Sequence, residues 1–267
     1  MMTAASLVAF ALVFLGATTG LSALMAAAVL ASGGALRRRG PWVERRAAAG
    51  ALVLPPLLAL GLVAALAADS ALGVWAGTDH CLDHDHHLHL CLLHGAAWAS
   101  QAWALALVVF AGTFAAVRSG LSLWAHAVAQ RSANRLRSLG TELAIRGCFV
   151  VPSRERFAFT AGLVSPTVLL SSAAWESLSP DQRDAVLAHE LGHLAHGDLW
   201  RRAALGFAAS FGAPLLASRV LGVWSLAAER ICDRRAALAV GRPSTVASAM
   251  LALVRTSSQR TAPAGAV

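Results

Sequence analysis

The sequence has no lysine and no tyrosine, and only 13% of its 267 residues carry a charge. Such a shortage of charge, together with 57% apolar residues, excludes an ordinary soluble enzyme and is typical of a polytopic membrane protein. The net charge of +8 comes from arginines that flank apolar segments and do not alternate with aromatic residues. This pattern argues against direct nucleic-acid binding, and the arginines are better interpreted as topology signals.

Three apolar segments are long enough to cross a bilayer. Residues 3–31 contain no charged side chain, and the missing basic n-region argues against a cleaved signal peptide. Residues 47–68 and 95–117 have the composition of a second and a third span. We therefore expect a membrane domain over residues 1–118 with three transmembrane helices.

The segment from Arg37 to Arg46 is rich in arginine and short, so the positive-inside rule predicts a cytoplasmic loop. The N-terminus then lies outside, and the chain from residue 119 onward is cytoplasmic. Heavy use of alanine is typical of a GC-rich bacterial genome. We expect a multi-pass protein of the bacterial inner (cytoplasmic) membrane.

Residues 69–94 would form an extracytoplasmic loop with an unusual density of histidine, cysteine and aspartate. Two interpretations stay open: a site for an extracytoplasmic metal ion, and a connector stapled by a Cys81–Cys91 disulfide. Such a loop is also a candidate input for an outside signal. Its candidate metal or disulfide residues are Cys81, His84, His86, His87, His89 and Cys91.

The motif His189-Glu190-Leu191-Gly192-His193 places two histidines four residues apart, on one face of a helix. This spacing is typical of a zinc site, and Glu190 can act as general base toward a water molecule. A helix start precedes it at Ser179-Pro180-Asp181-Gln182, with serine as N-cap and glutamine placed for a capping box. The alternative, a core helix that happens to carry histidines, would leave Glu190 buried without a reason.

A domain of mixed α and β structure is expected over residues 119–256, followed by a disordered tail at 257–267. Arg118 to Gly140 should form a helical connector, and Glu142–Val151 and Thr167–Ser171 have the composition of short strands. An edge strand near the motif could hold an extended substrate backbone.

A third zinc ligand must come from outside the motif, and Glu229 lies at a distance that suits a second helix packed against the first. The alternative for Glu229 is a surface ion pair with an arginine such as Arg234. His196, Asp198 and Asp233 are candidates for orienting a ligand or supporting the transition state. Because tyrosine is absent, an oxyanion would need a histidine such as His196, an arginine or backbone N–H groups.

Residues 203–226 are apolar enough to span a membrane, but a full crossing would separate Glu229 from the two histidines. We therefore expect this segment to be re-entrant, with its break at Gly212-Ala213-Pro214.

Four spaced motifs together resemble the BlaR/MecR family of membrane zinc metallopeptidases. They are Phe157-Ala158-Phe159-Thr160-Ala161-Gly162, Pro166 with Val168-Leu169-Leu170, Ala188 to His193 with Asp198, and Glu229 with Cys232-Asp233. The resemblance implies a gluzincin with zinc on His189, His193 and Glu229, and Glu190 as base. It also implies cytoplasmic cleavage of the protein itself or of a transcriptional repressor. No C-terminal penicillin-binding sensor domain follows, so β-lactam sensing is not expected.

The predicted fold is an α-helical integral membrane protein with a small α+β cytoplasmic zincin-like metallopeptidase domain. The predicted function is that of a membrane-embedded zinc metalloendopeptidase, which hydrolyses peptide or protein substrates beside the lipid bilayer. One alternative is a membrane quality-control or CAAX-type zinc protease, which shares the spacing of Glu229 and Asp233. Another is a metal-binding membrane sensor or transporter without proteolysis.

Overall fold

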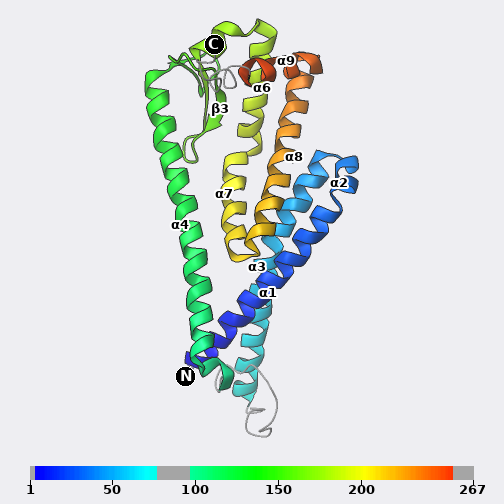
Figure 1. The fold of residues 1–267 in the computed structure, drawn as a ribbon, viewed down its shortest axis with the longest axis vertical. Helices are drawn as coiled ribbons and strands as arrows, with labels where there is room; N and C mark the ends of the chain where they lie inside the picture. The colour runs from blue at the N-terminus through cyan, green and yellow to red at the C-terminus, as the bar shows by residue number, and fades with distance from the viewer. Residues whose placement is uncertain (1–3, 77–96, 255–267) are drawn as a thin grey trace, which may run out of the picture. The chain divides into compact units, whose positions relative to one another are not determined.

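The computed structural model describes residues 4–76 and 97–254, and within them the chain is mostly helical (Figure 1). The elements of its first part are α1 (Ala4–Ala31), α2 (Gly33–Arg39), α3 (Pro41–Ala76), the 3-10 turn η2 (Ala97–Ser100) and α4 (Ala102–Leu139). The segment from Arg37 to Arg46 was predicted to be a loop, and this is wrong, because all of it except Gly40 belongs to α2 and α3. These helices meet at Gly40, whose φ of 105° favours glycine.

Within residues 4–76 and 97–254, three helices are long and apolar enough to cross a membrane: Ala4–Ala31, Pro41–Gly73 and Ala102–Leu139. Their mean hydropathies are 2.1, 2.3 and 1.8. The third span and the connector, expected as separate elements, form the single helix α4. A bent pair, Pro214–Val240 with Pro243–Leu253, brings the number of candidate spans in the described residues to four if it counts as one.

The chain divides into two compact units, which several helices share. Within the described residues, the first unit takes those up to 38, 46–121 and 205–223, and the second takes 39–45, 122–204 and those from 224 onward. The second unit contains all residues of the predicted zinc site. It also contains the first turn of α3, which the sequence analysis assigned to the membrane domain.

The second unit contains a four-stranded sheet in the order β1-β2-β4-β3. Its strands are β1 (Thr141–Glu142), β2 (Cys148–Val151), β3 (Ala158–Ala161) and β4 (Thr167–Ser171). β2 and β4 pair in parallel, and β1 and β3 join antiparallel. The prediction of β4 is confirmed, whereas the expected strand Glu142–Val151 is two strands joined by a turn at Gly147, which has a φ of 82°. β3, an edge strand, was not predicted.

Both faces of this sheet are covered. Val168 and Leu170 of β4 pack into one apolar core with α6 (Pro180–His196), α8 (Pro214–Val240) and α9 (Pro243–Val254). Leu169, between them, points to the other face and packs with Phe149 and Ala133 of α4. The alternation follows the two-residue period of a strand and explains why β4 is buried along its whole length.

Local signals fix the ends of α6. The Ser179 side chain accepts a hydrogen bond from the backbone N–H of Gln182, and the Gln182 side chain accepts one from Ser179. This confirms the predicted capping box, with Pro180 as the first helical residue. The helix ends at Gly197, in the left-handed conformation with φ 61°, and α7 (Asp198–Ala208) begins at once.

The apolar segment after α7 turns back on itself. The turn consists of η3 (Ala209–Phe211) followed by Gly212 and Ala213, and Pro214 begins α8. In the first unit, Ser22 of α1 accepts a hydrogen bond from Ala213 N, and an ideal Cβ on Gly212 would lie 2.3 Å from its oxygen. Only glycine fits there. The chain thus breaks at the expected residues, while re-entry into a bilayer stays a prediction.

Candidate metal centre

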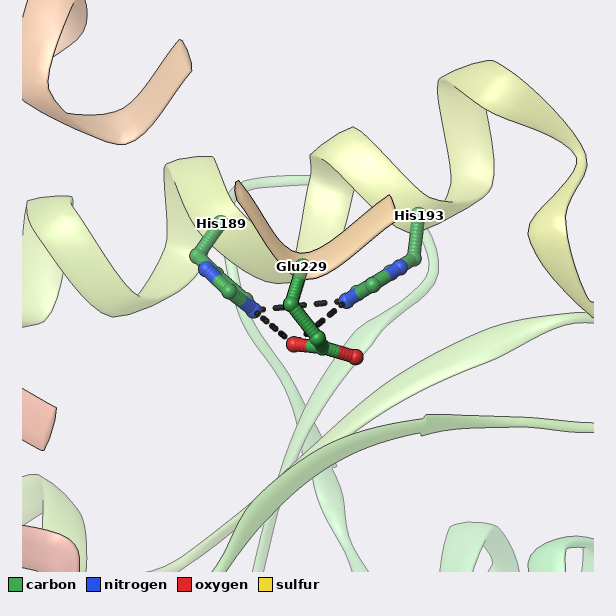
Figure 2. Close-up of side chains that lie close together, drawn as sticks. All are labelled: His189, His193 and Glu229. Carbon is green, nitrogen blue, oxygen red and sulfur yellow. Dashed lines mark hydrogen bonds and ion pairs between the residues drawn. The ribbon is translucent and has the colours of Figure 1, made fainter. Parts of the chain in front are cut away.

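Two helices bring three potential ligands to one point. His189 and His193 project from one side of α6 toward the carboxylate of Glu229 on α8 (Figure 2). The two Nε2 atoms lie 3.3 Å apart. Oε2 of Glu229 is 3.3 Å from Nε2 of His189 and 3.6 Å from Nε2 of His193. Glu229 therefore faces the motif, and it does not form the surface ion pair with Arg234 that was its alternative.

The size of this triangle fits zinc. Zinc holds nitrogen and oxygen ligands at about 2.0–2.2 Å, and tetrahedral angles then separate any two ligands by about 3.3–3.6 Å. The three separations between ligand atoms fall in that interval. Two imidazoles and a carboxylate are also a donor set that leaves the fourth position open. The residues present thus fit the predicted metal.

The electrostatics of the site favour a cation at its centre. Burial by itself lowers the pKa of His193, but hydrogen bonds, above all with Asp198, raise this pKa to about 12. Burial likewise opposes charge on His189, yet the contact with Glu229 raises its pKa above the ordinary value. Hydrogen bonds with the two histidines hold the pKa of Glu229 well below its usual range. Without metal, the carboxylates would retain protons on the imidazoles, and a dication can take their place.

Each histidine also has a carboxylate beside its Nδ1 atom. Asp198 Oδ2 lies 2.8 Å from Nδ1 of His193 and accepts a hydrogen bond from this nitrogen. Asp233 Oδ1 lies 3.0 Å from Nδ1 of His189, but off the hydrogen-bonding direction of the ring, so this contact is mainly electrostatic. Both contacts favour the tautomer that frees Nε2 for a metal. These positions suit the ligand-orienting role that was predicted for Asp198 and Asp233.

Glu190 is buried, and a residue of β3 holds its carboxylate. The Thr160 hydroxyl lies 2.7 Å from Oε2 of Glu190 and 3.1 Å from its backbone oxygen. Because the hydroxyl has one proton, it donates mainly to the nearer carboxylate oxygen. Thr160 was quoted only within a longer motif, and no local pattern marked its contact with Glu190.

A cavity of about 280 Å³ opens over these groups. Phe159, Leu199 and Trp224 give it apolar walls, and Arg202 is the cation among its lining residues. The Arg202 guanidinium donates to the hydroxyl of Ser225. The cavity therefore combines three potential metal ligands, the carboxylate of Glu190 and a guanidinium group.

Close packing of α6 against α8 sets the position of Glu229. An ideal Cβ on Gly192 would lie 3.0 Å from Sγ and 3.3 Å from Cβ of Cys232, so a larger residue would push the helices apart. Cys232 is fully buried, and its Sγ lies 3.5 Å from Nδ1 of His193. It thus lies on the side of the ring opposite to the three-ligand triangle.

Two residues in the first turn of α3 form ion pairs with residues beside the site. Arg45 forms a buried ion pair with Asp198, and its guanidinium lies 4.8 Å from the ring centre of Trp224. Its neighbour Glu44, also buried, pairs with Arg230 of α8. Sequence reasoning interpreted Arg45 as a topology signal, because a contact across 153 positions leaves no local trace.

His196, which was predicted as a possible support for the transition state, does not line this cavity. Its ring packs edge-on against Trp42 with ring centres 5.2 Å apart, beside a second hollow. The six candidate residues of the loop from Cys81 to Cys91, and the predicted tail at 257–267, lie outside the described residues.

Two helix-borne histidines, a glutamate from a second helix and a buried carboxylate are the groups that a metal-dependent hydrolase uses. Comparison with known families agrees: residues 122–266 match the model of peptidase family M48. Because the match covers more than half of the chain, the protein belongs to this family. The finer resemblance to BlaR/MecR is not confirmed by this match.

Relatives with a curated name are proteases. The chain is 34% identical over 74 residues to Protease HtpX of Aeromonas hydrophila and to that of Aeromonas salmonicida, covering 28% of this chain and 26% of each relative. It is 33% identical over 82 residues to Protease HtpX of Tolumonas auensis, covering 31% and 27%. The matches thus span about a quarter of these relatives. No solved structure matches significantly.

Proposed function

We propose that this chain is a zinc metalloendopeptidase of a bacterial inner membrane, with His189, His193 and Glu229 as metal ligands and Glu190 as general base. The observation that carries the proposal is the triangle of ligand atoms with sides of 3.3, 3.3 and 3.6 Å. Membership of a peptidase family and three helices apolar enough to span a bilayer support it.

The roles of the side chains follow from their contacts. A bound zinc ion supplies a Lewis acid that polarises the scissile carbonyl and acidifies a water molecule. Glu190, held by Thr160, takes the proton of the attacking water and passes it to the leaving amine. Asp198 fixes the tautomer of His193. Arg202 is the lining group placed to stabilise negative charge on the carbonyl oxygen, which answers the absence of tyrosine.

The substrate is an extended segment of protein. β3 is an edge strand of the sheet, and its residues Phe159 and Thr160 line the catalytic cavity, so a peptide can pair with this edge while its backbone crosses the metal centre. Such binding depends more on the backbone of the substrate than on its side chains, as suits a protease that acts on unfolded segments. The similarity to proteases named HtpX and the spacing of Glu229 and Asp233 favour the membrane quality-control alternative over cleavage of a repressor.

The orientation proposed is an N-terminus outside and the second unit in the cytoplasm. It follows from the arginines at 37–39 and 46 and from their bias toward one side of the spans. Signalling through self-cleavage or through the loop at 69–94 stays a prediction.

The test compares wild type with Glu190→Gln in the same membranes, with Glu176→Gln as a matched control because Glu176 is exposed and does not line the catalytic cavity. Cleavage of unfolded casein and of the chain itself is followed on gels, and zinc is measured by elemental analysis. We expect Glu190→Gln to bind zinc normally and to lose activity by several orders of magnitude, because the water loses its proton acceptor.

Equal casein cleavage by wild type and Glu190→Gln would reject the peptidase mechanism and favour a sensor or transporter. Cleavage of a co-expressed repressor, with casein left intact by wild type, would restore the signalling alternative.

A further inference from the structure

A second hollow, of about 270 Å³, lies in the second unit and shares no lining residue with the catalytic cavity. It combines two guanidinium groups and an imidazole with apolar side chains. Its lining residues are Trp42, His196, Ile231, Arg234, Arg235 and Leu238.

The positive charge of the hollow is uncompensated. Arg234 and Arg235 are exposed, and across residues 4–76 and 97–254 no carboxylate forms an ion pair with either. Burial lowers the pKa of His196, and nearby guanidinium groups, including that of Arg235, lower it further against the opposing effect of Asp198. An anion in the hollow would contact two guanidinium groups that form no ion pair within the described residues.

One apolar residue of the hollow, Trp42, lies at the end of a helix that is apolar enough to cross a bilayer. Trp42 is the second residue of a helix whose segment Pro41–Gly73 can cross a bilayer, so it lies at the end of that span. Tryptophan is enriched at this depth, where its ring contacts both headgroups and the first methylenes. Trp42 is 42% exposed and Leu238 78% exposed, which is costly in water but not against lipid.

We propose that this hollow binds the headgroup of an anionic phospholipid. Arg234 and Arg235 hold the phosphate, since guanidinium groups match its oxygens with paired N–H donors. Leu238 and Trp42 contact the glycerol backbone and the start of the acyl chains. A free phosphate would also bind to the two arginines but would make no contact with Leu238 and Trp42.

The test uses the full chain with Glu190→Gln, which prevents self-cleavage, in detergent with equal parts of phosphatidylglycerol and phosphatidylcholine. Native mass spectrometry counts the lipids retained. We expect preferential retention of phosphatidylglycerol, weakened about thirtyfold by the pair Arg234→Gln and Arg235→Gln, as two arginines near a membrane surface contribute together. The pair Arg146→Gln and Arg154→Gln makes the same charge change at exposed positions outside the hollow and should retain the lipid.

Two further arms separate lipid from free phosphate. Leu238→Ser should weaken retention of phosphatidylglycerol several-fold, and millimolar inorganic phosphate should not displace the lipid. Equal loss in the two arginine pairs would show unspecific charge attraction and overturn the proposal. Displacement by inorganic phosphate, with Leu238→Ser retaining lipid normally, would assign the hollow to a free anion and overturn it as well.

Discussion

Replacing Thr160 by valine should slow catalysis without affecting the metal. The substitution keeps the shape of the side chain and removes the hydroxyl that lies 2.7 Å from Oε2 of Glu190. A hydrogen bond to a charged group contributes about 1.5–3 kcal/mol, and water can replace part of it at this half-buried position. About 1.5–2 kcal/mol then remains, which corresponds to a fall in kcat of roughly ten- to thirtyfold. The zinc content should not change, because Thr160 contacts no proposed ligand.

The assay measures kcat, KM and zinc content for Thr160→Val, Thr160→Ser and the control Thr167→Val. Serine keeps the hydroxyl and should restore most of the activity. Thr167, on the adjacent strand β4, is buried and its hydroxyl has no partner among the described residues, so its loss should leave kcat unchanged. A wild-type kcat for Thr160→Val, or an equal fall for Thr167→Val, would refute the role of Thr160 in orienting the base.

Two more substitutions test the packing and the charge of the site. Gly192→Ala should weaken zinc binding by about tenfold, measured against a competing chelator, because the new methyl meets Cys232 and displaces α8. The control Gly222→Ala, on α8, adds a methyl in open space and should bind zinc as wild type does. Arg202→Gln should lower kcat by about a hundredfold with little change in KM, if Arg202 stabilises the transition state. Its neighbour Arg201 does not line the cavity, so an equal effect of Arg201→Gln would assign the loss to general charge.

Local patterns predicted the parts of the site that depend on local rules. The capping box at Ser179 and Gln182 and the four-residue spacing of His189 and His193 are properties of one helix, and the structure places them as expected. The facing position of Glu229 was inferred because a zinc site needs a third ligand, a chemical constraint that reaches across the chain.

The features that sequence reasoning missed depend on contacts between distant segments. β3 has only four residues and partly exposed side chains, so it lacks the apolar run that marked β4. Arg45 looked like a solvated charge of a loop because arginine is usually exposed, and only the fold reveals its buried partner Asp198. The turn at Gly147 could have been predicted, since a glycine inside a strand pattern often marks a break in the strand.

The buried ion pair of Arg45 with Asp198 makes the proposed site depend on the first turn of α3. The part of the chain that matches the family begins at residue 122, yet the cation that neutralises Asp198 comes from the first turn of α3. A fragment that begins after α3 would keep all three proposed ligands and the apolar helix α4, but it would lose that cation, and removing one partner of a buried ion pair costs about 3–5 kcal/mol. The first turn of α3 is therefore part of the unit that holds the proposed ligands, although it lies outside the residues that match the family.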